Sequence, residues 1–177
     1  MSLEIFNVVR SMANSKVKNY IVPGLTSSLI GGGKFGKVRL FEASRLQTEF
    51  ISPHSHRFNF ACLVLRGLVK NIVWQKCNQQ DGDYYQKSKL FVGEDFGDYK
   101  LEDEERGFWK FSAKTFIENQ WYTMQHREIH SIEFSKDAIV LFFEGYKKSE
   151  FSYVLEPIVE GSKVPTFKVE DWMFKTE

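Results

Sequence analysis

The chain contains four histidines, and they fall into two close pairs. His54 and His56 are separated by one residue, and His126 precedes His130 by four. In an extended strand the side chains at positions i and i+2 point to the same side, so the first pair can share one ion. Neutral imidazole nitrogens suit iron, zinc, copper and nickel. A third ligand must then come from another strand, and His130 can supply it because it begins a predicted strand.

Three protein nitrogens would leave coordination positions open on a metal ion. Open positions are typical of a catalytic site, where water, substrate or dioxygen completes the coordination. A single His-x-His pair is weak evidence, since such pairs also occur at surfaces and in cores. The prediction is stronger here because every histidine belongs to one of two close pairs. The sequence leaves three roles open for His126: a structural or surface residue, a proton carrier near the metal, or an alternative third ligand.

The elements that must position these histidines are short strands. From residue 37 onward apolar stretches are separated by polar turns, a pattern typical of a sandwich or closed barrel. The stretch that contains glycines 31–33 is expected to be a loop, and residues 94–106 are expected to form a solvated loop or lid. A short amphipathic helix is expected at residues 2–13, packed outside a core of about residues 37–156. The predicted strands cover residues 37–46, 57–66, 68–75, 84–92, 108–116, 120–125, 129–134, 138–144 and 152–156.

Composition favours one β-rich domain. Of the 177 residues, 17 are phenylalanine and four are proline, and aromatic residues fit a pleated, half-buried surface. We expect residues 1–177 to form a single domain, because this length fits one domain and is enough to bury a core. The net charge of +1 gives no reason to expect binding to nucleic acid or to an anionic membrane.

Cellular location is predicted from the cysteines and from the first residues. Cys62 and Cys77 lie outside any metal-ligand motif, and we expect free thiols in a reducing compartment. The first sixteen residues contain no long apolar run and no cleavage signal, so the sequence predicts neither secretion nor a transmembrane helix. We therefore expect a cytoplasmic protein.

The surroundings of the first histidine pair resemble the first motif of the cupin superfamily. That motif has a histidine pair, an acidic residue three or four positions later, and a glycine after six more. In this chain His54 and His56 are followed by Phe60 at the acidic position and by Gly67 at the glycine position.

The second histidine cluster is similar to the second cupin motif, in which a single histidine completes the metal site. Residues 122–130 lead into an apolar strand that ends at Glu144, although the Pro-x-Gly that precedes the family's histidine is absent. The resemblance covers residues 37–146 and implies an all-β, double-stranded β-helix (jelly-roll) barrel. It also implies a divalent metal ion on His54, His56 and His130.

The missing acidic ligand narrows the resemblance. Phe60, or Ala61 if the spacing is one longer, replaces it, and neither side chain binds metal. The centre is then similar to that of the thiol dioxygenases, which include cysteine dioxygenase and bind Fe(II) with three histidines. There a cysteine at this position is cross-linked to a tyrosine, whereas Phe60 and Glu144 stand at the corresponding places here. The resemblance implies Fe(II) as the favoured ion, with zinc, nickel or manganese as alternatives, but gives no case for a cysteine substrate.

Alternation along the strands predicts the lining of the barrel. If the first histidine pair points inward, alternate residues of the following strand do so too, and the same rule applies around His130. We expect a mainly aromatic and apolar cavity that holds a small organic substrate by its shape. Tyr122 and His126 are the candidate catalytic side chains. The predicted pocket residues are Phe58, Phe60, Cys62, Met124 and Ile132.

Three functions remain open from the sequence. The first is a non-haem iron, dioxygenase-like enzyme acting on a small organic molecule. The second is a metal-dependent isomerase or lyase, in which the ion acts as a Lewis acid and His126 moves a proton. The third is a non-enzymatic module that binds or senses a small ligand. The fold alone does not decide between them. Exposed strand edges also predict a homodimer.

Overall fold

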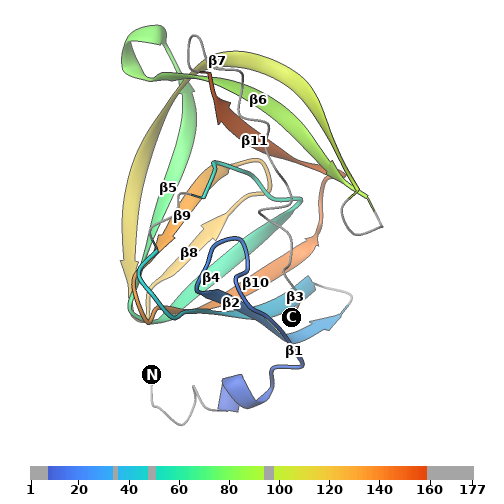
Figure 1. Cartoon of the computed structure of the whole chain (residues 1–177), viewed down its shortest axis with the longest axis vertical. Coiled ribbons are helices and arrows are strands. Elements are labelled where there is room, and N and C mark those ends of the chain that lie inside the picture. The colour runs from blue at the N-terminus through green and yellow to red at the C-terminus, as the bar shows by residue number, and fades with distance from the viewer. Residues whose placement is uncertain (1–7, 34–35, 48–50, 94–97, 159–177) are drawn as a thin grey trace.

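The computed structural model describes residues 8–33, 36–47, 51–93 and 98–158. Within these ranges the chain forms eleven strands in two antiparallel sheets (Figure 1). The six-stranded sheet has the order β1-β2-β3-β10-β4-β8, and the five-stranded sheet has the order β11-β6-β7-β5-β9. The strands are β1 (Ser15–Val17), β2 (Leu25–Gly33), β3 (Gly36–Ala43), β4 (Phe58–Arg66), β5 (Leu68–Cys77), β6 (Asp83–Val92), β7 (Tyr99–Ile117), β8 (Trp121–Met124), β9 (Ile129–Phe134), β10 (Ile139–Lys147) and β11 (Phe151–Pro157).

Successive parts of the chain cross between the two sheets. After β3, the segment 51–56 crosses to the second sheet, where His54 forms a bridge with His130 in β9. The chain returns with β4, crosses again with β5 and the β6–β7 hairpin, and then places β8, β9 and β10 in alternate sheets. This order is that of a jelly roll, the architecture of cupins. The all-β jelly-roll barrel predicted from the sequence is therefore confirmed.

Gly67 makes the corner at which β4 turns into β5. Its φ of +72° lies in the left-handed region, and a Cβ atom there would lie 2.8 Å from Ser135 Oγ and 3.0 Å from Ala138 Cα. Glycine is favoured at such a position because it adopts positive φ without steric cost. Gly67, the glycine of the first motif, thus allows the chain to cross from one sheet to the other between β4 and β5.

Two of the predicted loops are wrong. Residues 25–33 form β2, which pairs along β3 with a bulge between Leu29 and Gly31. Residues 99–106 belong to the long strand β7, whose first part, from Tyr99 to Trp109, pairs with β6. Two acidic residues of this stretch, Glu104 and Glu105, form ion pairs with Lys87 across the hairpin, at 2.9 and 3.2 Å. Residues 94–97 of the predicted lid lie outside the described residues.

The other elements follow the prediction closely. The remaining predicted strands are present, and the predicted strand at 108–116 is the second half of β7. Residues 8–11 are helical, while residues 2–7 of the predicted helix lie outside the described range. No helix in the described part of the chain is long and apolar enough to cross a membrane.

The main core lies between the two sheets and is mostly aromatic and aliphatic. A smaller cluster, formed around Trp74, Trp109 and Leu155, packs on the other face of the curled five-stranded sheet. Strand β5 serves both cores because its residues alternate: Val69 and Asn71 face the barrel, while Ile72 and Trp74 face the smaller cluster. The barrel interior is thus enclosed by strands that are packed on both faces.

Candidate metal centre

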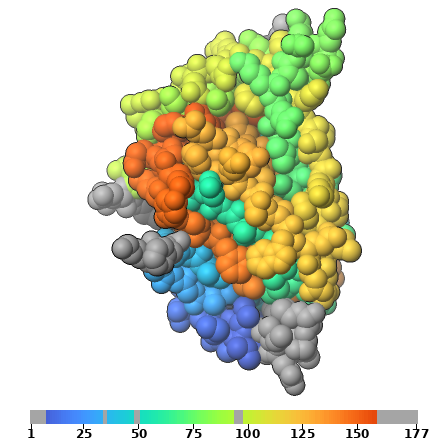
Figure 2. All heavy atoms as spheres, turned by 180° about the vertical axis from the view of Figure 1, so that it is seen from behind, coloured from blue at the N-terminus to red at the C-terminus, as the bar shows by residue number. Residues whose placement is uncertain are grey.

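The segment that carries His54 is held on both sides by backbone hydrogen bonds. The His54 amide donates to the His130 carbonyl at 2.9 Å, and the His130 amide donates to the His54 carbonyl at 2.8 Å. On the other side, the amides of Ser55 and Leu155 donate to the carbonyls of Tyr153 and Pro53 at 2.8 and 2.9 Å. Figure 2 shows this segment, in teal, between orange atoms of the C-terminal strands. His54 therefore has an extended conformation fixed by its neighbours, although it lies in isolated bridges and not in a long strand.

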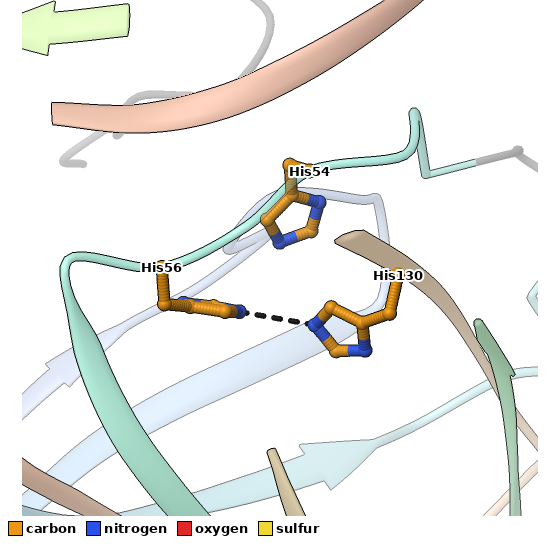
Figure 3. A group of neighbouring side chains, drawn as sticks. All are labelled: His54, His56 and His130. Carbon is orange, nitrogen blue, oxygen red and sulfur yellow. Dashed lines mark hydrogen bonds between the residues drawn. The ribbon is translucent and has the colours of Figure 1, made fainter. Parts of the chain in front are cut away.

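The structure brings His54, His56 and His130 together. Their rings surround a common space (Figure 3), and their ligand atoms all lie within 4.8 Å of one another. The ring centroids of His54 and His56 are 4.9 Å apart, and each lies 5.2 Å from the centroid of His130. The Nε2 atoms of His56 and His130 are 3.0 Å apart. Residues from two distant parts of the sequence thus form one group of nitrogen ligands.

Neighbouring oxygens determine which nitrogen carries the proton in two of the three rings. His130 Nδ1 lies 2.7 Å from Asn71 Oδ1, and the Asn71 amide nitrogen donates to Met124 Sδ at 3.4 Å. This second contact orients the amide, so we assign the Nδ1 proton to His130 as the donor. His54 Nδ1 likewise donates to the Ser52 carbonyl at 2.9 Å. Both rings therefore present the lone pair of Nε2, which is the arrangement that metal-binding histidines adopt.

All three histidines are neutral near neutral pH. Burial lowers the pKa of His54. Burial and then the neighbouring imidazoles lower the pKa of His56 and of His130 well below the usual range. Neutral imidazole is the form that binds metal, so few protons compete with a cation here.

Phe60 occupies the place where the sequence lacks an acidic ligand. It is 4% exposed, and its ring lies 4.7 Å from that of His56 and 5.5 Å from that of His130. Among the described residues, the group of possible ligands contains neither a carboxylate nor a thiol. The ligand set is neutral and one of its sides is covered by an aromatic ring.

A cavity of about 240 Å³ adjoins the three histidines. Of the predicted pocket residues, Phe58, Phe60, Cys62 and Ile132 line it. Met124 does not line it; this residue is buried in the adjoining core and lines a neighbouring groove. The cavity walls are aromatic and aliphatic, but they also carry charged side chains.

The two candidate catalytic residues differ in position. Tyr122 lines the cavity beside Cys62, and burial raises its pKa well above the usual value. His126 is not brought to the histidine group. Its backbone amide lies 2.9 Å and its ring Nδ1 3.2 Å from Asn59 Oδ1, on the half-exposed turn that follows β8. Of the three roles left open for His126, these contacts fit the structural one.

Several residues of the site were not predicted from the sequence. Asn71 contacts His130 across a strand pair, and no local motif marks it. The cavity is also lined by charged residues, which the predicted set of pocket residues did not include. Alternation along β3 could have indicated Lys37 and Arg39, because both share the inward side with Phe41. The charged lining residues are Lys37, Arg39, Arg57 and Glu144.

Comparisons with known proteins give only distant similarities. No family model and no curated protein matches the chain. Among solved structures, a hydroxypropylphosphonic acid epoxidase from S. wedmorenis has a TM-score of 0.44 and 10% identity, and the match covers 75% of this chain but 55% of that one. Drosophila melanogaster CENP-C bound to CAL1 has a TM-score of 0.42 and 10% identity over 80% of this chain and 92% of that one.

A hydroquinone 1,2-dioxygenase in complex with Cd²⁺ and 4-hydroxybenzonitrile has a TM-score of 0.40 and 14% identity, over 80% of this chain and 71% of that one. Similarities at this level do not indicate what this chain binds or does. The functional argument therefore rests on this chain's own residues: a jelly-roll barrel of cupin architecture that brings three neutral histidines together beside an aromatic cavity.

Proposed function

We propose that this protein is a metal-dependent cupin in which His54, His56 and His130 bind one divalent ion, with Fe(II) as the favoured ion. The observation that carries the proposal is the convergence of three neutral imidazoles, one buried and two half-buried, whose ligand atoms lie within 4.8 Å of one another. Imidazole is a good ligand for iron, and it suits zinc and nickel as well.

The distance between His56 and His130 indicates whether a metal ion would fit between them. With the Nδ1 proton of His130 donated to Asn71, the 3.0 Å contact between the two Nε2 atoms requires a proton on His56 Nε2. A divalent ion would take the place of this proton at Nε2, and neutral His56 would then carry its proton on Nδ1. Two adjacent ligands at about 2.1 Å from an ion, at a right angle to each other, are about 3.0 Å apart. The pair therefore already has the spacing of adjacent metal ligands.

We further propose that the reaction is of the dioxygenase type, on a small organic substrate. When bound to three nitrogens, Fe(II) offers open positions at which dioxygen and a substrate can meet. The residues of the chain would position the metal ligands and the substrate. Asn71 and the Ser52 carbonyl hold the imidazoles in position, and the rings of Phe58, Phe60 and Phe142 exclude water and contact the substrate. A neutral ligand set and an aromatic wall support this proposal over a closed structural metal site.

Metal analysis together with oxygen uptake tests the proposal. The protein would be loaded anaerobically with Fe(II), Zn(II) or Mn(II), desalted, and assayed with a panel of small organic substrates. We expect oxygen consumption with the Fe(II) form alone, and its loss in His130→Ala. The variant His126→Ala is a matched control, because its ring contacts Asn59 and not the histidine group.

Two results would contradict the dioxygenase assignment. Turnover by the Zn(II) or Mn(II) form without oxygen would indicate an isomerase or lyase. Tight retention of a ligand without turnover would indicate a binding module.

A further inference from the structure

One wall of the cavity is charged. Arg39 and Lys37 extend from β3, Glu144 extends from β10, and Arg57 precedes β4. In the sheet Glu144 lies directly opposite Lys37, and Arg39 lies opposite Phe142, whose ring is 6.1 Å from that of His56. The same cavity thus joins the metal-ligand group to a set of basic side chains.

Arg39 is held in place by the residues around it. Its Nε atom lies 3.6 Å from Glu144 Oε2, and its Nη1 atom donates to Ser27 Oγ at 3.5 Å. The side chains of Arg39 and Glu144 are only 22% and 15% exposed, so the guanidinium is partly withdrawn from water. A guanidinium has five donors in a planar fork, and these two contacts leave donors available for another acceptor.

The described cavity lining has an excess of positive charge. Lys37, Arg39 and Arg57 line this cavity together with one carboxylate, Glu144. Among the described residues of this wall, Arg39 and Glu144 form an ion pair. A divalent ion on three neutral ligands would add further positive charge. Charges in a partly desolvated site require compensation, and a concave positive surface attracts anions.

We propose that the ligand of this cavity is an organic carboxylic acid with an aromatic body. The carboxylate binds Arg39 and Arg57, and the body lies against Phe58, Phe60 and Phe142 beside the histidines. Arginine forks match carboxylate geometry, and aromatic side chains form the rest of the wall. The volume of about 240 Å³ is below the range for drug-sized ligands and therefore suits a small acid. The statement that this acid is a substrate rests on the proposed function. The statement that the cavity binds an organic anion does not rest on it.

Ligand titration by calorimetry tests this proposal without relying on the metal. Benzoate, phenylacetate and 3-phenylpropanoate would each be compared with the corresponding amide, in metal-free and in Zn(II)-loaded protein. We expect at least one acid to bind the metal-free protein about tenfold more tightly than its amide, because charge-assisted hydrogen bonds form only with the acid. Phenylphosphonate, titrated beside benzoate, tests the head group, and tighter binding of the phosphonate would overturn the choice of a carboxylate.

Variants of the charged wall make the test specific. Arg39→Gln and Arg57→Gln should each reduce the preference for the acid about tenfold and leave amide binding unchanged. Glu144→Gln should strengthen acid binding several-fold, because it removes the carboxylate that competes for Arg39. Arg66→Gln is the matched control, since Arg66 is exposed and does not line this cavity. Thermal unfolding of each variant checks that it is folded.

The outcomes separate the two proposals. The acid site is overturned if acids and amides bind equally, if no acid binds saturably in either form, or if the preference survives in both arginine variants. Loss of metal binding with an intact acid preference in metal-free protein would contradict the proposed function alone. An intact metal site without acid preference would contradict this inference alone.

Discussion

Asn71 orients the imidazole of His130. It is 5% exposed, and its Oδ1 accepts from His130 Nδ1 while its amide nitrogen donates to Met124 Sδ. We expect Asn71→Ala to lower the affinity for a divalent ion about 10- to 100-fold, because the ring loses both its fixed tautomer and its orientation. Competition with a chelator of known affinity measures this. Asn59→Ala, which loses only the contact with His126, should bind as the wild type does.

An unchanged affinity in Asn71→Ala would contradict the assigned tautomer. Such a result would leave the histidine group in place but show that its rings are held by packing alone.

The two cysteines should differ in reactivity. Both are free; Cys62 is buried in the cavity wall and Cys77 is half-buried. Burial raises the pKa of the Cys62 thiol to about 12, and only the thiolate is a good nucleophile. In folded protein at about pH 8, iodoacetamide should therefore modify Cys77 well before Cys62, and unfolding in denaturant should remove the difference. Mass spectrometry of the modified peptides measures this. Equal modification in the folded state would show that the cavity is open to solvent at Cys62.

At the residue scale, the sequence predicted what depends on residue type and parity. The two close pairs of histidines are visible in the sequence itself. The alternation of side chains in strands predicts the inward direction of Phe58, Phe60 and Cys62. The role of Asn71 depends on which strands are neighbours. It contacts His130 because β5 pairs with β9, with Asn71 opposite Ile132. That register is a property of the folded sheet and is not encoded in a local motif.

At the scale of elements, the corner at Gly67 positions the strands on either side of the barrel. Gly67→Ala should lower the free energy of unfolding by about 1 to 3 kcal/mol, because the added Cβ is strained at positive φ and meets Ser135 and Ala138. Gly31→Ala is the matched control: a Cβ there meets nothing within 4 Å, and its effect should be within about 0.5 kcal/mol. Urea denaturation of both variants measures this. Equal stabilities would show that the corner relaxes without cost.

Both wrong predictions at this scale concern strands with unusual composition. Gly31 to Gly33 suggested a loop, yet pairing with β3 keeps these residues extended. The charged stretch before Gly107 suggested a solvated loop, yet Lys87 lies within ion-pair distance of both Glu104 and Glu105 across the hairpin. In both places partners from elsewhere in the sheet determine the conformation, and intrinsic propensity is overridden. Elements with alternating apolar residues, such as β4 and β9, were predicted to within one residue.

At the scale of the whole molecule, His54, His56 and His130 make stability depend on pH. Burial lowers the pKa of His54, His56 and His130 in the folded state. The unfolded chain therefore binds more protons than the folded chain at pH values between about 6.5 and the lowered values. Since stability rises with pH wherever the unfolded state binds more protons, the metal-free protein should lose stability as the pH falls below about 6.5.

Urea denaturation from about pH 7 to about pH 5 measures this dependence. Each histidine that takes up its proton only on unfolding contributes up to about 1.4 kcal/mol per pH unit in this window. The same titration of a variant with all three histidines replaced by alanine should show a shallower slope. A slope equal to that of the wild type would show that the three rings are not neutral in the folded protein.

The central claim is that the jelly roll brings three histidines together in order to bind a metal ion, and metal stoichiometry tests it most directly. The protein and the triple variant His54→Ala, His56→Ala and His130→Ala would be loaded anaerobically with Fe(II), desalted, and submitted to elemental analysis alongside far-UV circular dichroism. We predict about one ion per chain in the wild type and essentially none in the folded triple variant. A wild-type protein that retains no ion after loading, or a triple variant that retains as much, would contradict the account.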